Sequence, residues 1–327
     1  MAERISEDDL IARYLAPIAG AAGLRLVDDA ALFAPPAGRD LVLTKDALVA
    51  GVHFFPEDAP DDIARKALRV NLSDLAAKGA RPEGFLLALA LPADFSESWI
   101  ARFAQGLGED ARAYACALFG GDTVSTPGPL TLSITALGSV EQGRMVLRSG
   151  ARAGDALYVS GTIGDAALGL RLRRDTSGSE QLTREESAFL LRRYLRPEPR
   201  VALAEALARH ASGAMDVSDG LVGDLAKMMR ASAVAAQARL PAIPLSAAAR
   251  RLTAARPEAL AAALTGGDDY EILASVPQDA CVAFEDAARA AGVAVARIGS
   301  VQAGEGVVIT DAAGAAMRFA QSSYSHF

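Results

Sequence analysis

The sequence has few of the residues that bind zinc or form disulfides. It contains two cysteines, Cys116 and Cys281, and three histidines among 327 residues. No Cys-x-x-Cys or His-x-x-x-His pair occurs, so a zinc centre is not expected. Both cysteines lie in apolar, helix-like stretches. This favours buried free thiols and a reducing, cytoplasmic location.

Long apolar runs and an excess of basic residues are also absent. The longest apolar run, Phe85 to Leu91, has the length of a strand and is too short to span a bilayer. The N-terminal stretch MAERISEDDL is acidic and lacks the apolar core of a signal peptide. The chain carries 33 basic and 40 acidic residues, a net charge of −7, whereas duplex binding needs a basic stripe. We therefore expect neither a membrane nor a nucleic acid as a partner.

Two common nucleotide-binding motifs are missing as well. The sequence has no GxxxxGK[ST], which excludes a P-loop, and no GxGxxG follows a predicted strand. An enzyme built from this chain that uses ATP must hold the phosphates in another way.

The composition is that of a globular protein, with 51% hydrophobic and 22% charged residues. The patterns predict helices over 6–18, 61–78, 96–116, 163–172, 183–195, 199–210, 221–229 and 279–291, and strands over 41–44, 48–54, 85–91, 130–140, 156–160, 270–276, 294–301 and 306–310. Gly120-Gly121-Asp122 is typical of a tight turn. A polar, glycine-bearing stretch near residue 150 suggests two domains, 1–148 and 149–327, of α/β (or α+β) class.

Aspartates beside glycines and at the predicted ends of strands are the main chemical feature. Magnesium prefers hard oxygen ligands, and such positions let phosphates approach the backbone. The aspartates in such positions are Asp28, Asp29, Asp46, Asp74, Asp122, Asp216, Asp219, Asp268 and Asp269. Taken singly, Asp219 is better explained as a helix cap and Asp28 or Asp29 as an ordinary turn. Asp74 is different, because its apolar neighbours imply partial burial and a buried carboxylate needs a partner or a metal.

In order and spacing, these motifs resemble those of the thiamine-monophosphate kinase family, within the AIR-synthase-like (PurM-like) superfamily. The likeness runs almost end to end and is carried by VDDAAL (27–32), TKDALVAGVHF (44–54), KALRVNLSDLAAKGARP (66–82), GGDT (120–123), RSGARAGD (148–155), MDVSDGL (215–221), GGDDYEI (266–272) and SYSHF (323–327). It implies a two-domain PurM-like fold, with an N-terminal mixed sheet that pairs in a homodimer and a C-terminal α+β sandwich.

The resemblance also implies the reaction and its residues. ATP would phosphorylate thiamine phosphate to thiamine diphosphate with several Mg²⁺ ions. The implied metal ligands are Asp29, Thr44, Lys45, Asp46, Asp74, Asp122, Asp216 and Asp219, of which Asp46, Asp74 and Asp122 would be catalytic. The implied ATP contacts are Gly121, Asp122, Arg148 and Ser218, and the implied contacts with thiamine phosphate are His53, Asp268 and Tyr324. Arg148 suits the phosphate role because its guanidinium donates forked hydrogen bonds.

Three positions depart from the family pattern. Val27 stands where the family usually has glycine, and Lys45 where it usually has threonine or serine. A protonated lysine cannot ligate magnesium, so Lys45 either points away or offsets phosphate charge itself. Asp268 replaces the usual glutamate, which shortens the arm that would reach the thiamine ring.

The implied mechanism is direct in-line transfer onto an acceptor phosphate that is already ionised, so positioning and charge neutralisation carry catalysis. The alternatives are another PurM-like activity (AIR synthesis, selenide activation or hydrogenase maturation) or a nonenzymatic nucleotide- or metal-sensing dimer. His53, the GGDDYE motif and Tyr324 favour the thiamine reaction, and the near-complete aspartate set favours an enzyme.

Overall fold

The computed structural model describes residues 5–321 and residue 323. The chain forms two compact units: residues up to 75 with 81–143, and residues 76–80 with those from 144 onward. Within the part of the chain that the structure describes, no helix is long and apolar enough to cross a membrane.

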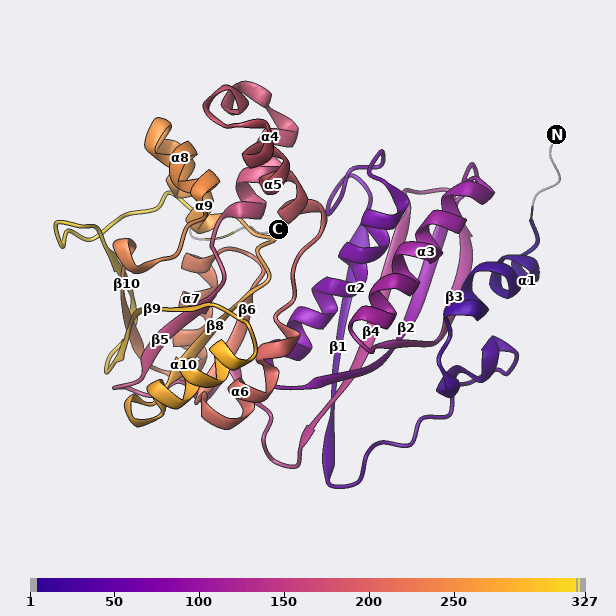
Figure 1. Cartoon of the computed structure of the whole chain (residues 1–327), viewed down its shortest axis with the longest axis horizontal. Coiled ribbons are helices and arrows are strands. Elements are labelled where there is room, and N and C mark those ends of the chain that lie inside the picture. The colour runs from indigo at the N-terminus through magenta and orange to yellow at the C-terminus, as the bar shows by residue number, and fades with distance from the viewer. Residues whose placement is uncertain (1–4, 322, 324–327) are drawn as a thin grey trace. The chain divides into compact units, whose positions relative to one another are not determined.

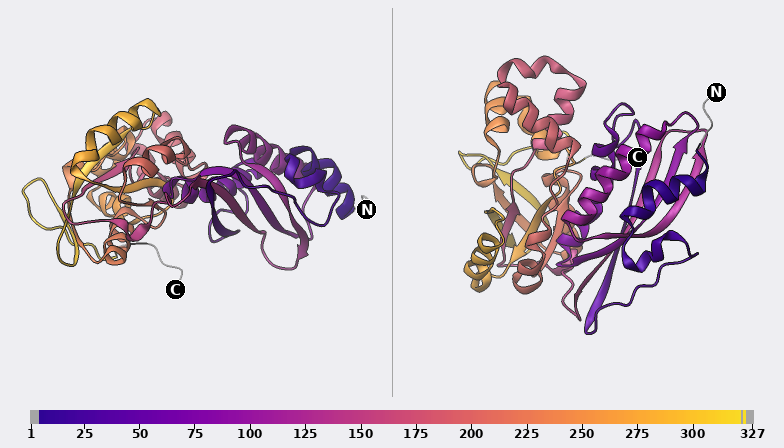
Figure 2. Two further views of the ribbon diagram at one scale, coloured as in Figure 1. Left: turned by 90° about the horizontal axis from the view of Figure 1, so that it is seen from below. Right: turned by 45° about the vertical axis from the view of Figure 1, so that its right-hand side comes forward.

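Unit 1 is a four-stranded sheet with two long helices. Its elements are α1 (Glu7–Leu10), β1 (Arg39–Val49), α2 (Pro60–Ala77, whose last two residues belong to unit 2), β2 (Arg81–Pro92), α3 (Glu97–Ala113), β3 (Ala117–Thr126) and β4 (Thr131–Glu141). The strand order is β1-β4-β2-β3; β4 is antiparallel to both neighbours, and β2 is parallel to β3. Helices α2 and α3 lie across one face of this sheet (Figures 1 and 2).

The two faces of this sheet differ in burial, and alternate residues of each strand point to opposite faces. Val42 and Leu48 of β1 are buried on the helix side. The opposite face exposes apolar side chains, including Leu43, which is 63% exposed, and Leu86, which is 40% exposed. Among the described residues of unit 1, both long helices, α2 and α3, lie on the first face.

Unit 2 is a larger α/β unit. Its elements are β5 (Ala156–Ser160), α4 (Asp165–Arg174), α5 (Arg184–Leu195), α6 (Ala204–His210), β6 (Gly213–Val217), α7 (Leu221–Ser232), β7 (Ala235–Arg239), α8 (Ala247–Ala255), α9 (Pro257–Thr265), β8 (Glu271–Val276), α10 (Cys281–Ala290), β9 (Val295–Gln302) and β10 (Gly306–Thr310). The strand order is β10-β7-β9-β5-β8-β6, with only the β10–β7 pair parallel.

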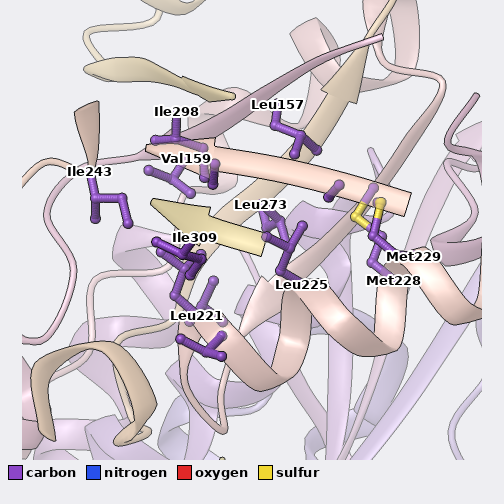
Figure 3. Close-up of a cluster of buried hydrophobic side chains, with 14 of the residues drawn as sticks. Leu157, Val159, Leu221, Leu225, Met228, Met229, Ile243, Leu273, Ile298 and Ile309 are labelled. Atoms are coloured by element: carbon purple, nitrogen blue, oxygen red, sulfur yellow. The ribbon is translucent and has the colours of Figure 1, made fainter. Parts of the chain in front are cut away.

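The sheet of unit 2 is buried on both faces. On β5, Leu157 and Val159 face a cluster with Leu225 and Met228 of α7 (Figure 3), whereas Tyr158 packs with Phe284 of α10 in a second cluster. A third cluster joins α4, α5, α8 and α9. The continuous burial of β5 and β8 explains why these strands were predicted from their largely apolar sequences, whereas the equally buried β6 was not predicted.

The structure corrects two local predictions. Two separate strands were expected over 41–44 and 48–54, but one strand, β1, runs without a break from Arg39 to Val49, and residues 51–53 form a turn. Gly120-Gly121-Asp122 is not a tight turn, because it lies inside β3 beside β2. Strand β7 was not predicted, since its sequence AAQAR lacks the β-branched and aromatic residues that mark strands.

Candidate functional site

An acidic pair lies between β1 and α2 in unit 1. The hydroxyl of Thr44 donates a hydrogen bond to Asp74 Oδ2 at 2.5 Å, and the Asp46 amide donates to Asn71 Oδ1 at 3.2 Å. Thr44 and Asp46 share the side of β1 that faces α2, one strand period apart. The structure therefore brings together three of the sequence-predicted ligands: Thr44, Asp46 and Asp74.

The carboxyl group of Asp46 has a raised pKa. Burial, with the negative charge of Asp74 as a second cause, raises the pKa of Asp46 from 3.8 to about 6. Two carboxylates held together in this way repel each other unless a proton or a cation lies near them. The donor set of two carboxylates and a hydroxyl suits a hard divalent cation such as Mg²⁺.

Lys45 lies on the other face of β1. Its pairing partner on β4 is Thr135, and Thr135 pairs in turn with the exposed Leu86 of β2. Asp46 instead pairs with the buried Ile134. The Lys45 ammonium thus points away from Asp46, and only the backbone of Lys45 lies near the acidic pair.

A second group of predicted residues lines a cavity of about 670 Å³ within unit 1. Asp28, Asp29, Gly121 and Asp122 lie on its wall together with apolar side chains such as Phe33. Asp28 and Asp29 form a local turn, in which the Asp29 amide donates to Asp28 Oδ1 at 2.8 Å. Both the turn interpretation of Asp28 and a ligand role for Asp29 are compatible with this geometry.

The two acidic groups of unit 1 are separate. Asp122 pairs with Ala88 and shares its exposed side of the sheet, whereas Asp46 points at α2. Among the described residues, no three His, Cys, Asp or Glu side chains meet closely enough to hold a metal ion by themselves. Water and phosphate oxygens normally complete a magnesium shell, so a pair of carboxylates is a common protein contribution.

His53 follows β1 in a turn beside Gly51. Its Nδ1 accepts a hydrogen bond from the Val49 amide at 3.0 Å, and its carbonyl accepts one from Lys66 Nζ at 3.1 Å. Because Nδ1 is the acceptor, the neutral imidazole carries its proton on Nε2. An imidazole Nε2–H group is a donor of the kind that binds a phosphate oxygen.

In unit 2, the end of β6 and the start of α7 carry Asp216, Ser218 and Asp219. Asp216 is 6% exposed. Asp219 does not cap α7, because the helix begins after Gly220 without a side-chain cap. Instead, Asp219 Oδ2 accepts a hydrogen bond from Lys227 Nζ, and the same ammonium reaches Asp224 Oδ1 at 2.8 Å.

A second loop of unit 2, Gly266–Tyr270, lies directly against this segment. The Asp268 amide donates to the Ser218 carbonyl at 2.9 Å, and the Tyr270 amide donates to the Val217 carbonyl at 2.9 Å. Gly267 permits this approach, since a Cβ at that position would lie 2.3 Å from the Ser218 carbonyl oxygen. The structure thus joins Ser218, a predicted ATP contact, to Asp268, a predicted acceptor contact.

The two remaining predicted residues have different outcomes. Arg148 is exposed in a 3₁₀ turn of unit 2, where its carbonyl accepts a hydrogen bond from Ser232 Oγ at 3.2 Å. Tyr324 lies outside the described residues.

Sequence reasoning missed the polar residues that support the site. Asn71, Asp224 and Lys227 bind backbone or carboxylate groups of predicted ligands. Asn71 lies within the motif NLSDL three residues before Asp74, and Asp224 lies five residues after Asp219. The sequence did hold a clue for Asn71 and Asp224: each is a polar residue at a helix position where the spacing of apolar residues predicts burial. A buried polar group needs a hydrogen-bond partner.

Comparisons with known proteins place this fold and these motifs. The family model described as AIR synthase related protein, N-terminal domain, matches residues 27–140, and its C-terminal counterpart matches residues 152–312. The chain therefore belongs to the AIR synthase related proteins, and its two units form the two-domain PurM-like α/β fold.

More similar relatives define the family further. Thiamine-monophosphate kinase of Caulobacter vibrioides is 46% identical over 311 residues, which are 92% of this chain and 86% of that protein. The chain thus belongs to the thiamine-monophosphate kinase family of enzymes. The crystal structure of this kinase from Stenotrophomonas maltophilia K279a is 43% identical with a TM-score of 0.80, covering 87% of this chain and 89% of that one. A structure of AaThiL complexed with AMPPCP and TMP is 30% identical with a TM-score of 0.78, covering 100% of both chains.

Proposed function

We propose that this protein transfers the γ-phosphoryl group of ATP to thiamine phosphate and so forms thiamine diphosphate. The observation that carries the proposal is the direct backbone pairing of Ser218 with Asp268, because it joins the predicted ATP loop to the predicted acceptor loop. Family membership supports the same reaction, since a 30% identical relative holds AMPPCP, an ATP analogue, together with TMP.

The residues proposed to hold Mg²⁺ are Asp29, Thr44, Asp46, Asp74, Asp122, Asp216 and Asp219, with Lys45 contributing through its backbone. The repulsion between Asp46 and Asp74 supports a cation there, because it is relieved when positive charge is bound. When bound, magnesium supplies charge neutralisation for the phosphates.

The chain's own groups then bind and orient the substrates. Arg148 and the backbone at Gly121 and Ser218 are proposed to bind the phosphates of ATP. His53 donates from Nε2 to the acceptor phosphate, and Asp268 binds the thiamine moiety. The acceptor oxygen is already ionised, so no residue is assigned as a general base, and positioning in line carries the rate. Asp46, Asp74 and Asp122 are catalytic in this sense.

We also propose that two copies of unit 1 pair through the exposed face of the sheet. Leu41, Leu43, Leu86 and Val124 are large apolar side chains on this unit with exposures from 39% to 63%. Exposed large apolar side chains on one face of a sheet are typical of a subunit interface. The domains expected at 1–148 and 149–327 are proposed as the nucleotide-binding, dimer-forming half and its C-terminal partner. The two buried free cysteines support a reducing cytoplasm.

The reaction is tested by incubating the protein with ATP, Mg²⁺ and thiamine phosphate and separating the products by chromatography. Thiamine diphosphate and ADP in equal amounts are expected. ATP turnover that is independent of thiamine phosphate would favour another PurM-like activity. Nucleotide binding without any product would favour a sensor.

A further inference from the structure

A buried ionic cluster lies directly behind the loop that carries Asp268. Glu271 is fully buried, and both of its oxygens are bound. Oε1 accepts hydrogen bonds from Arg193 Nη2 at 2.8 Å and from Arg200 Nη2, and Oε2 accepts from Arg200 Nε at 2.7 Å and from Ser160 Oγ at 2.6 Å. The Ser160 hydroxyl accepts in turn from the Ile272 amide at 2.7 Å. A single carboxylate thus fixes the first residue of β8 from three directions.

Asp269, two residues earlier, is held by a different element. Its Oδ2 accepts from the Gly164 amide at 2.7 Å and its Oδ1 from the Ala166 amide at 3.3 Å, at the N-terminus of α4. Asp269 is 1% exposed. Arg193 links the two carboxylate positions, because its Nη2 also lies 3.5 Å from the Asp269 carbonyl oxygen.

The loop held by this cluster is in an unusual backbone conformation. Asp268 has a φ of +71° and Tyr270 a φ of +51°, both in the left-handed region that residues other than glycine rarely occupy. Such a conformation persists only where surrounding contacts enforce it. Asp269 lies between these two residues, and Glu271 follows Tyr270. The buried hydrogen bonds of Asp269 and Glu271 therefore hold the backbone of Asp268 and Tyr270 in this conformation.

The packing around Glu271 is built to admit both arginines. Gly161 has a φ of +53°, and a Cβ there would lie 2.1 Å from Glu271 Oε1 and 2.6 Å from Arg200 Nη2. Any side chain at position 161 would displace the ion pair. Arg200 approaches from the segment before α6, Arg193 from α5 and Ser160 from β5, so three separate segments converge on one carboxylate.

We propose that Glu271, Arg193 and Arg200 form a clamp that positions Asp268 for contact with the acceptor, thiamine phosphate. These are positioning residues that act through Asp268, and the assignment rests on the proposed function. The clamp fixes the C-terminal end of the loop, where β8 begins. Asp269 fixes the middle of the loop through the backbone amides of Gly164 and Ala166. The Ser218 carbonyl fixes Asp268 by accepting its amide hydrogen bond. Loosening the clamp lowers affinity for the acceptor and leaves ATP binding largely unchanged.

The test is a double-mutant cycle between Arg200→Met and Asp268→Ala. Arg200 is the suitable member because its side chain is 21% exposed and Arg193 still neutralises Glu271 after the change. Arg200→Met is expected to raise the KM for thiamine phosphate about 10- to 100-fold, the effect of losing a charged hydrogen bond. The KM for ATP is expected to change less than about threefold. In the Asp268→Ala background the same substitution adds less than about twofold, because coupled residues are not additive.

Two further variants keep the test decisive. Arg200→Lys retains the charge without the forked geometry and should give a KM for thiamine phosphate between those of wild type and Arg200→Met. It replaces Arg200→Met in the cycle if that variant does not fold, as judged by circular dichroism. Arg251→Met is the matched control: it removes an arginine that pairs with Glu186 at 2.9 Å elsewhere in unit 2 and should leave both KM values unchanged.

Additive effects of Arg200 and Asp268, or equal increases in both KM values, would overturn the clamp while leaving the proposed function intact. A wild-type protein that neither binds thiamine phosphate by calorimetry nor phosphorylates it would overturn the proposed function and the clamp's role together.

Discussion

Replacing Asp46 with asparagine should raise the stability of unit 1 and abolish the proposed phosphoryl transfer. In the metal-free protein the pKa of Asp46 is about 6, above its ordinary value of 3.8. The folded state therefore binds this proton more tightly than the unfolded state does. The resulting stabilisation is fully present below pH 3.8 and is lost as the pH rises through about 6. At pH 7.5 the ionised Asp46 is a net cost to folding, and Asp46→Asn removes that cost.

The two pKa values correspond to about 3 kcal/mol at full effect, since one pKa unit is about 1.4 kcal/mol. Asp46 is partly exposed, so solvent screening reduces the expected gain to about 1–2 kcal/mol. The backbone contacts of Asp46, with Asn71 and Ser133, do not involve the substituted group. We expect Asp46→Asn to be more stable than wild type in EDTA at pH 7.5 and to have lost turnover by orders of magnitude.

The assay is urea denaturation followed by tryptophan fluorescence, in EDTA at pH 4.5 and at pH 7.5. Trp99 is the only tryptophan and lies in α3, stacked on Phe103 with ring centroids 5.2 Å apart, so the signal reports on unit 1. Asp94→Asn removes an exposed carboxylate of the same unit and serves as the matched control. Added Mg²⁺ should stabilise wild type but not Asp46→Asn. A variant that is no more stable than wild type at pH 7.5, or that gains as much at pH 4.5, would refute the electrostatic reasoning.

Lys45→Thr should leave the magnesium dependence of turnover unchanged, because the side chain at this position points away from Asp46; a shifted magnesium titration would contradict this. Leu43→Glu should convert the proposed dimer to monomer in analytical ultracentrifugation, whereas Val282→Glu, an exposed apolar position of unit 2, should not; an unchanged mass for Leu43→Glu counts against the sheet interface. Leu225→Ala should lower the free energy of unfolding by about 2–5 kcal/mol in denaturant titration followed by circular dichroism, since Leu225 is fully buried; a loss below about 1 kcal/mol would show that the core collapses around the cavity. Burial raises the pKa of Cys116 to about 12, so at pH 8 only about one thiol in 10⁴ is ionised and native Cys116 should resist thiol reagents in peptide mapping; rapid labelling would show that the segment between α3 and β3 opens.

The sequence was most informative where one physical pattern dominated. Helix α2 was predicted because apolar residues recur at helical spacing, and α3 and α5 were predicted within a few residues of their observed bounds. The structure adds that α5 begins with a capping box of Thr183 and Glu186. Strands β5 and β8 were predicted because their residues are nearly all apolar. The structure explains this composition, since both faces of each strand are buried. The two-domain PurM-like fold came from the order of motifs and was confirmed by the comparisons.

The pairing and register of the strands could not be predicted from the sequence. Nothing in the motif Gly120-Gly121-Asp122 shows that it runs beside Leu87 and Ala88 in a parallel pair, so the glycines were interpreted as a turn. Likewise, the face on which Lys45 lies depends on the register of β1 with β4. A side chain's face changes when a register shifts by one residue, and only the paired strands decide it.

The departure at Asp268 shows how such tertiary constraints reach a single residue. The resemblance to the family leads one to expect glutamate here, and the shorter aspartate arm looks at first like a loss. The backbone at this position has a φ of +71°, and aspartate tolerates the left-handed region better than most residues because its short side chain bonds locally. Glu271, Asp269 and Ser218 fix the loop. In a fixed loop, a well-defined position of the Asp268 carboxylate matters more for the proposed substrate contact than the length of its side chain. Aspartate therefore suits the backbone conformation at this position, and the proposed clamp would hold its carboxylate in one place.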